Sequence, residues 1–274
     1  MHARRVDLHT HTTSSDGALQ SAELVAAALE RGLTTIAVTD HDTVAGILPS
    51  LAAAHGTTLT VLAGVELSAQ LDGRQFHLLG YGIDPASPGL LSALHDLAER
   101  RTERARAMVE KLAGEGAPIS WDAVAAIGRG AVGRPHIAQA LVQAGYAANV
   151  SDAFARFIGD GCPAYIPSSI LTPAQVVEIV QAAGGQVALA HPLRRSKPLP
   201  LGEILPRLKR EGISGLEVYH SEHDAAAVAM LRETALREAM WWSGGSDFHG
   251  PSKPNVELGG VGVPPEVLDQ GPFR

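Results

Sequence analysis

The sequence predicts an α/β protein in which about seven strand–helix units form a barrel that a helical insertion interrupts. Short β-branched runs alternate with Ala-rich runs of helical spacing in the first part of the chain. The same alternation returns in the last part, and residues 85–165 carry almost only helical patterns. Strands that alternate with helices favour parallel pairing under covering helices, so we expect a discontinuous barrel of residues 1–84 and 166–274.

The first part of the chain opens with a strand over residues 6–9. A helix follows over 21–31, because apolar residues recur there at helical spacing and Gly32 supplies a stop. The other elements expected here are strands at 34–39, 58–67 and 76–81 and a helix at 44–55.

The insertion follows Asp84-Pro85, where the pattern changes. Its expected helices span 90–112, 121–127, 135–144 and 151–157. The last part of the chain predicts helices at 172–183, 201–211 and 223–238 and strands at 186–190, 215–219 and 240–243. Functional residues of α/β barrels gather at the C-terminal ends of strands, and we expect the insertion to cover that mouth.

Composition excludes several classes of protein. The chain has 274 residues, 45% of them hydrophobic and 19% charged, which is typical of a globular protein. A net charge of −7 disfavours binding to long duplex nucleic acid, which relies on many phosphate contacts. The sequence contains no run of about 18 apolar residues, so we expect no membrane span. No signal-like segment follows the first charges, so we expect a cytoplasmic protein with no membrane partner.

Metal-ligand residue types stand at or near the ends of the expected strands. Two pairs, His9 with His11 and Asp247 with His249, have i, i+2 spacing, which places both side chains on one side of a strand. The whole set comprises His9, His11, Asp16, His41, Glu66, His77, His191, Asp247 and His249. A single histidine of this kind is more often structural. Nine such groups at one barrel mouth would be costly to bury without cations between them, so the set predicts a metal centre.

The same residues belong to longer motifs. DLHTHTTSSDG, TDHD, GVE, the isolated His77, AHP and SDFH occur in this order from Asp7 to His249. In this the sequence resembles the polymerase and histidinol phosphatase (PHP) superfamily. The Gly-Arg-Pro-His element at 133–136 and the Gly-Leu-Glu-Val-Tyr segment at 215–219 are most similar to the subgroup that hydrolyses nucleotide phosphates and trims short RNA from its 5′ end.

The resemblance implies a distorted seven-stranded β/α barrel that holds three divalent metal ions. It implies that His9, His11, Glu66 and Asp247 hold the first ion, that Glu66, His77 and His191 hold the second, and that Asp16, His41 and His249 hold the third. Glu66 would bridge the first two ions. Imidazole mixed with carboxylate suits Mn²⁺, Zn²⁺ or Fe²⁺ better than Mg²⁺.

From these ligands we expect hydrolysis of phosphate esters by a metal-bound hydroxide, with Glu66, Asp247 and His249 as catalytic residues. The expected substrates are nucleoside 3′,5′-bisphosphates, nucleoside monophosphates and short 5′-phosphorylated oligoribonucleotides. Histidinol phosphate or another sugar phosphate is the alternative substrate. A metal-stabilised accessory or binding module is the alternative without catalysis.

Other polar residues remain open at this point. The resemblance favours Arg134 and His136 as substrate ligands, against a surface arginine and a helix-packing histidine. His220 follows a strand end and is a further candidate for substrate binding. Arg194 and Arg195 either hold a second phosphate or are solvated loop charges. The remaining positions are Asp7, Asp40 and Asp42, expected to orient ligand histidines or to cap turns, and His2, His55 and His95, expected at the surface.

Overall fold

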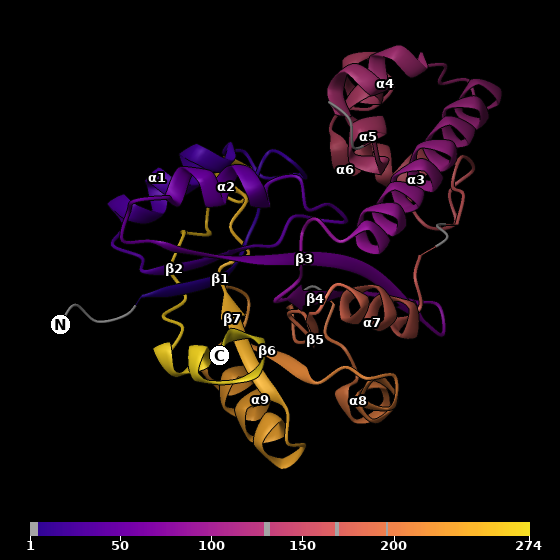
Figure 1. Cartoon of the computed structure of the whole chain (residues 1–274). Helices are drawn as coiled ribbons and strands as arrows, with labels where there is room; N and C mark the ends of the chain where they lie inside the picture. The colour runs from indigo at the N-terminus through magenta and orange to yellow at the C-terminus, as the bar shows by residue number, and fades with distance from the viewer. Residues whose placement is uncertain (1–4, 129–131, 168–169, 196) are drawn as a thin grey trace. The chain divides into compact units, whose positions relative to one another are not determined.

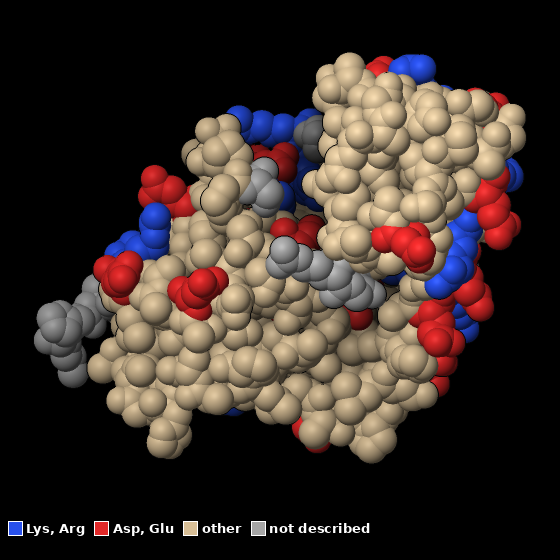
Figure 2. All heavy atoms as spheres, turned by 90° about the horizontal axis from the view of Figure 1, so that it is seen from above, with Lys and Arg blue, Asp and Glu red and all other residues tan. Residues whose placement is uncertain are grey.

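The structure, a computed structural model, describes residues 5–128, 132–167, 170–195 and 197–274 (Figure 1). The chain divides into two compact units. Met1–Ala93 and Ile170–Arg274 form the barrel unit, and Leu94–Ser169 form the helical unit. Neither the described helices of the barrel unit nor those of the helical unit include one long and apolar enough to cross a membrane. On the face in Figure 2, basic side chains occur in small groups next to acidic ones rather than as one broad surface.

The barrel unit is built on one sheet of seven strands, paired in chain order from β1 to β7. The strands are β1 Val6–Thr10, β2 Thr35–Val38, β3 Thr60–Leu71, β4 Arg74–Tyr81, β5 Gln186–Leu189, β6 Gly215–His220 and β7 Trp241–Gly245. Strands β1, β2 and β6 are buried along their whole length, as expected for strands covered on both faces. All seven expected strands are present, and the expected α/β barrel is confirmed.

The two outer strands of the sheet, β1 and β7, meet and nearly close the barrel. The backbone N–H of Asp247 donates to the carbonyl of His9 at 2.9 Å, and the N–H of His11 donates to the carbonyl of Phe248 at 3.1 Å. Gly245 permits this approach, because a Cβ there would lie 2.2 Å from the backbone nitrogen of His9. The segment after β7 therefore carries its polar side chains directly beside the end of β1.

One strand runs against the expectation of parallel pairing. β4 is antiparallel to both β3 and β5. Asp72 and Gly73 connect β3 to β4, with φ values of 49° and 77°. A two-residue turn with positive φ at both positions joins antiparallel strands, whereas a parallel pair needs a crossover of a dozen or more residues. As a result His77 lies in the middle of β4, opposite Ser68, rather than at a C-terminal strand end.

Helices cover the sheet of the barrel unit (Figure 1). They are α1 Ser21–Glu30, α2 Ile47–Ala54, α7 Pro173–Ala182, α8 Leu201–Arg210 and α9 Ala225–Arg237. Their beginnings follow from local sequence: Thr172 and Asp224 accept backbone N–H groups at the starts of α7 and α9. Each helix lies within a few residues of the expected range.

The helical unit has its own apolar core. Its elements are α3 Pro88–Gly114 (which begins in the barrel unit), α4 Trp121–Gly128, α5 Arg134–Gln143, α6 Val150–Ala153 and a π-helical turn at Phe154–Ile158. Met108, Leu112, Val124, Ile137 and Leu141 are fully buried in one cluster. The apolar residues of α5 and of the C-terminal half of α3 thus pack against each other inside this unit.

Candidate metal centre

The barrel brings all nine predicted ligands together. Three groups of them have ligand atoms within 4.8 Å of one another. They are His9, His11, Glu66 and Asp247; His11, Asp16, His41 and His249; and His41, Glu66 and His77. His191 joins the third group, since its Nε2 lies 2.9 Å from Glu66 Oε1 and 3.4 Å from His77 Nδ1. Glu66 thus lies at the junction of two of the groups.

The carboxylate of Glu66 divides its two oxygens between two sets of imidazoles. Oε2 lies 3.2 Å from His9 Nε2, 3.2 Å from His11 Nε2 and 3.1 Å from His41 Nδ1. Oε1 lies 2.8 Å from His77 Nδ1 and 2.9 Å from His191 Nε2. Glu66 is fully buried. Burial opposes its ionisation, but the surrounding imidazoles outweigh that effect and hold the pKa of Glu66 well below its usual value.

A second carboxylate, Asp247, completes the group around β1. Its Oδ1 lies 3.2 Å from His11 Nε2 and 3.6 Å from His9 Nε2. Burial lowers the pKa of His11, yet hydrogen bonds that the ring donates to Asp247 and Glu66 raise it overall to about 9. The carboxylates therefore stabilise a positive charge at this position, as they would stabilise a bound cation.

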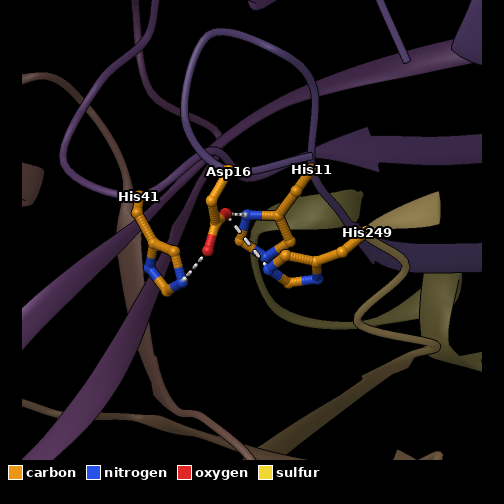
Figure 3. A group of neighbouring side chains, drawn as sticks. All are labelled: His11, Asp16, His41 and His249. Atoms are coloured by element: carbon orange, nitrogen blue, oxygen red, sulfur yellow. Dashed lines mark ion pairs between the residues drawn. The ribbon is translucent and has the colours of Figure 1, made fainter. Parts of the chain in front are cut away.

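Asp16 gathers the third group from the loop after β1 (Figure 3). Its Oδ1 lies 3.1 Å from His249 Nε2 and 3.6 Å from His11 Nδ1, and its Oδ2 lies 3.8 Å from His41 Nε2. The side chain of Asp16 is 53% exposed, unlike those of Glu66 and Asp247. This side of the centre is therefore open to solvent, and hence to a small substrate.

The imidazoles differ in their readiness to donate a lone pair. Burial lowers the pKa of His41 well below its usual value and that of His191 to about 4. Both rings are therefore neutral at pH 7, the form that binds a metal ion. The Nε2 of His11 is buried between two carboxylates, 3.2 Å from Oε2 of Glu66 and 3.2 Å from Oδ1 of Asp247. Neutral imidazoles at His41 and His191, together with ionised carboxylates around His11, fit a set of first-row divalent cations.

Two of these side chains are carried on strained backbone. His191 has φ of 26° and Asp247 has φ of 57°, a region that non-glycine residues rarely occupy. Such positions cost roughly 1–3 kcal/mol each and persist only where the surroundings fix them. Glu217 Oε2 accepts the backbone N–H of His191 at 2.6 Å. The carbonyl of His9 accepts the backbone N–H of Asp247.

Glu217, in the middle of β6, is a site residue that sequence reasoning missed. It is fully buried, and its Oε1 lies 2.8 Å from His9 Nδ1. One carboxylate thus fixes the ring of His9 and the backbone of His191, the kind of support that holds ligand histidines in metalloproteins. The available signal was a single acidic residue inside the apolar run GLEVY.

Lys253 is a second residue that the sequence did not reveal. Its Nζ lies 2.7 Å from Asp247 Oδ2, on the side of the carboxylate away from His11. Buried His220 approaches the same oxygen, with its Nε2 at 3.4 Å. Asp247 therefore presents one oxygen to the histidines of β1 and is held by two nitrogens at the other.

The three aspartates that were not assigned as metal ligands accept hydrogen bonds from backbone N–H and hydroxyl groups. Asp7 accepts hydrogen bonds from Ser246 and from the N–H of Gly259. Asp40 accepts the N–H and hydroxyl of Thr12 and the hydroxyl of Ser15, and Asp42 accepts the N–H of Ser68. Asp7 also accepts the backbone N–H of His9 at 3.3 Å, so it supports a predicted ligand, whereas the printed contacts of Asp40 and Asp42 hold loop segments. His55 and His95 are exposed, as expected, and His2 lies outside the described residues.

Arg134 and His136 belong to the helical unit. Arg134 donates to Asp160 Oδ1 at 2.8 Å, and its guanidinium lies over the rings of Phe154 and Tyr165. His136 Nδ1 accepts the N–H of Gly133, which fixes the start of α5. Their contact with a substrate stays a prediction, as does that of His220.

Comparison with known proteins agrees with this geometry. The model of the PHP domain family matches residues 7–115. The 5′-3′ exoribonuclease Rnm of Salmonella typhimurium is 34% identical over 92% of this chain and 87% of its own length. The 3′,5′-nucleoside bisphosphate phosphatase of Chromobacterium violaceum is 32% identical over 93% of this chain and 90% of its own. A structure from Bifidobacterium adolescentis, assigned as a metal-dependent phosphoesterase, superposes with a TM-score of 0.84 at 34% identity, over 97% of this chain and 95% of that one.

Proposed function

The chain belongs to the PHP family of phosphoesterases, and on that premise we propose that it hydrolyses phosphate esters of small nucleotides at a centre of three divalent metal ions. The proposed substrates are nucleoside 3′,5′-bisphosphates, nucleoside monophosphates and short 5′-phosphorylated oligoribonucleotides. The names of its relatives, an exoribonuclease and a bisphosphate phosphatase, support this substrate class. The alternative of a module without catalysis is set aside, because these relatives are enzymes.

The observation that carries the proposal is the division of Glu66 between two sets of histidines. A carboxylate that faces His9 and His11 with one oxygen and His77 and His191 with the other has the geometry of a bridge between two cations. Mn²⁺, Zn²⁺ or Fe²⁺ bound there would supply the charge that activates a water and holds the phosphate oxygens. The protein residues fix the relative positions of these charges.

The residues of the centre have different roles in binding the cations and the substrate. His41 and His191 are neutral at pH 7 and present lone pairs. Asp16 is the exposed ligand on the side from which a phosphate can enter. Glu217 keeps Nε2 of His9 directed inward, because Nδ1 is engaged by its carboxylate at 2.8 Å. The remaining catalytic residues of the proposal, Asp247 and His249, lie next to each other, with His249 Nδ1 3.3 Å from Asp247 Oδ1.

A panel of substrates tests the proposal. Protein loaded with Mn²⁺, Zn²⁺ or Fe²⁺ is assayed for phosphate release from a nucleoside 3′,5′-bisphosphate, a 5′-phosphorylated oligoribonucleotide and histidinol phosphate. We expect the nucleotides to have the larger kcat/KM. A preference for histidinol phosphate would favour the sugar-phosphate alternative, and release from none of the three would overturn the proposal.

A further inference from the structure

We propose that a pocket beside His77 and His191 is an anion subsite that binds a second phosphate of the substrate, the one that is not cleaved. This inference rests on the proposed function, because it assumes that the cleaved phosphate binds at the histidine–carboxylate centre. The pocket lies wholly within the barrel unit. Its described lining residues are Gln75, Phe76, His77, Ala190, His191, Arg194, Lys197 and Leu199.

The pocket and the candidate metal centre share two walls. His77 and His191 line the pocket, and the same rings lie 2.8 and 2.9 Å from Oε1 of Glu66. A phosphate ester held at the centre must place the rest of its molecule in a neighbouring space. The shared histidines make this pocket such a space, adjacent to the reacting phosphate.

The charges that line the pocket favour an anion. Arg194 and Lys197 contribute two cations, and none of the described lining residues is acidic. Outside the lining residues, Glu222 pairs with Arg194: its Oε1 lies 3.4 Å from Arg194 Nε, and both side chains are 33% exposed. This ion pair engages Nε, at the inner end of the guanidinium. The two terminal nitrogens lie at the other end of the group, and an arginine can hold phosphate with two parallel hydrogen bonds.

The size of the pocket limits what it can hold. Its volume is about 220 Å³, below the roughly 300–1,000 Å³ of sites that enclose a whole drug-sized ligand. It therefore takes part of a nucleotide rather than all of it. Phe76 and Leu199 supply apolar walls against which a sugar can pack, and Gln75 supplies an amide. A phosphate attached to a ribose matches this mixture.

Two variants and a matched control test the subsite. Arg194→Gln and Lys197→Met each remove one cation of the pocket. Arg195→Gln removes the same charge from the same loop, at an exposed residue that does not line the pocket. The measurements are kcat and KM for a nucleoside 3′,5′-bisphosphate, the corresponding nucleoside monophosphate and a 5′-phosphorylated dinucleotide, with the bound metal content of each variant.

The two pocket variants should raise KM for the bisphosphate roughly tenfold each, because each loses a charge-assisted contact to a group that does not react. Their kcat, their metal content and their KM for the monophosphate should stay near wild type. Lys197→Arg should retain the wild-type KM. Arg195→Gln should change nothing.

The dinucleotide distinguishes two sources of the second phosphate. A raised KM for the bisphosphate alone assigns the pocket to a terminal phosphate, and a raised KM for both assigns it to an internal phosphodiester as well. An equal loss for all three substrates, or no change for the bisphosphate, would overturn the subsite. Failure of wild-type protein to hydrolyse any of them would instead overturn the proposed function.

Discussion

The barrel unit and the helical unit treat charge in opposite ways. The barrel unit buries Glu66, Glu217 and Asp247 together with several histidines. In the helical unit, every described buried residue of the core is apolar. Charged side chains lie at the surface of this unit; that of Asp160, for example, is 74% exposed. Buried charges destabilise a fold unless opposite charges or cations compensate them. The barrel unit is therefore organised around buried charges that need compensation, and the helical unit is organised around apolar packing.

The largest effect is expected in the barrel unit, from Glu66→Gln. The change keeps the size of the side chain but removes the charge that the two sets of histidines share. Loss of a support residue behind a metal ligand costs 10- to 100-fold, so loss of the bridge itself should lower kcat/KM by more than about 100-fold. Bound metal should fall as well, by elemental analysis.

Glu238→Gln is the matched control, since it removes an acidic group of the same unit that pairs with Lys209 at the surface. It should leave activity and metal content unchanged. If Glu66→Gln keeps near wild-type turnover at saturating metal, then the buried charge of Glu66 is no more important for activity than the surface charge of Glu238.

Glu217→Gln should have the next largest effect. The carboxamide can still accept one hydrogen bond, but it cannot hold His9 and the backbone of His191 with a full charge. We expect metal affinity to fall about 10- to 100-fold, measured by competition with a chelator, while the circular dichroism spectrum is retained. Unchanged metal affinity would show that Glu217 serves the fold alone.

Acidity should weaken metal binding in the barrel unit in a defined range. The pKa of His11 is raised to about 9, so this ring is protonated at pH 7 and must lose its proton when a cation binds. Although burial opposes protonation of His9, the carboxylates around it raise the pKa of that ring as well. Apparent metal affinity should therefore rise from pH 7 to pH 9 by up to about tenfold per pH unit for each of the two rings. A titration that is flat over this range would contradict the role of His11 as a ligand.

The smallest effect is expected in the helical unit, from Arg134→Ala. If Arg134 contacts the leaving group, hydrolysis of a bisphosphate should weaken roughly tenfold more than that of an aryl phosphate. Arg156→Ala is the matched control, because Arg156 also pairs with an aspartate and lies over a phenylalanine ring of the same unit. Equal losses for both arginines would assign Arg134 to structure.

Much of the fold could be predicted because its signals are local. Most strands contain a short β-branched or aliphatic run, and α7 and α9 begin at the caps Thr172 and Asp224. The predicted parallel direction of β4 was wrong, because β4 is antiparallel to β3. The dipeptide Asp72-Gly73 between two apolar runs is a signal for a hairpin. Parallel pairing was inferred from the alternation of the neighbouring elements, and the turn outweighs that pattern.

The candidate site was predictable in its residues and not in its supports. His9 and His11 or Asp247 and His249 stand out because their spacing places both members of a pair on one side of a strand. Glu217 and Lys253 act through contacts across the barrel with residues far away in the chain, or through the path of a loop. Neither leaves a periodic pattern. The pocket at Arg194 and Lys197 likewise depends on where the loop after β5 lies against β4.

The central claim is that Glu66 bridges two cations in a three-metal centre. Anomalous diffraction from crystals of metal-loaded protein, at the absorption edge of the bound metal, tests it most directly. We expect three peaks, two of them roughly 3.5–4 Å apart with one Glu66 oxygen at each. A single peak, or peaks that Glu66 does not contact, would contradict the account.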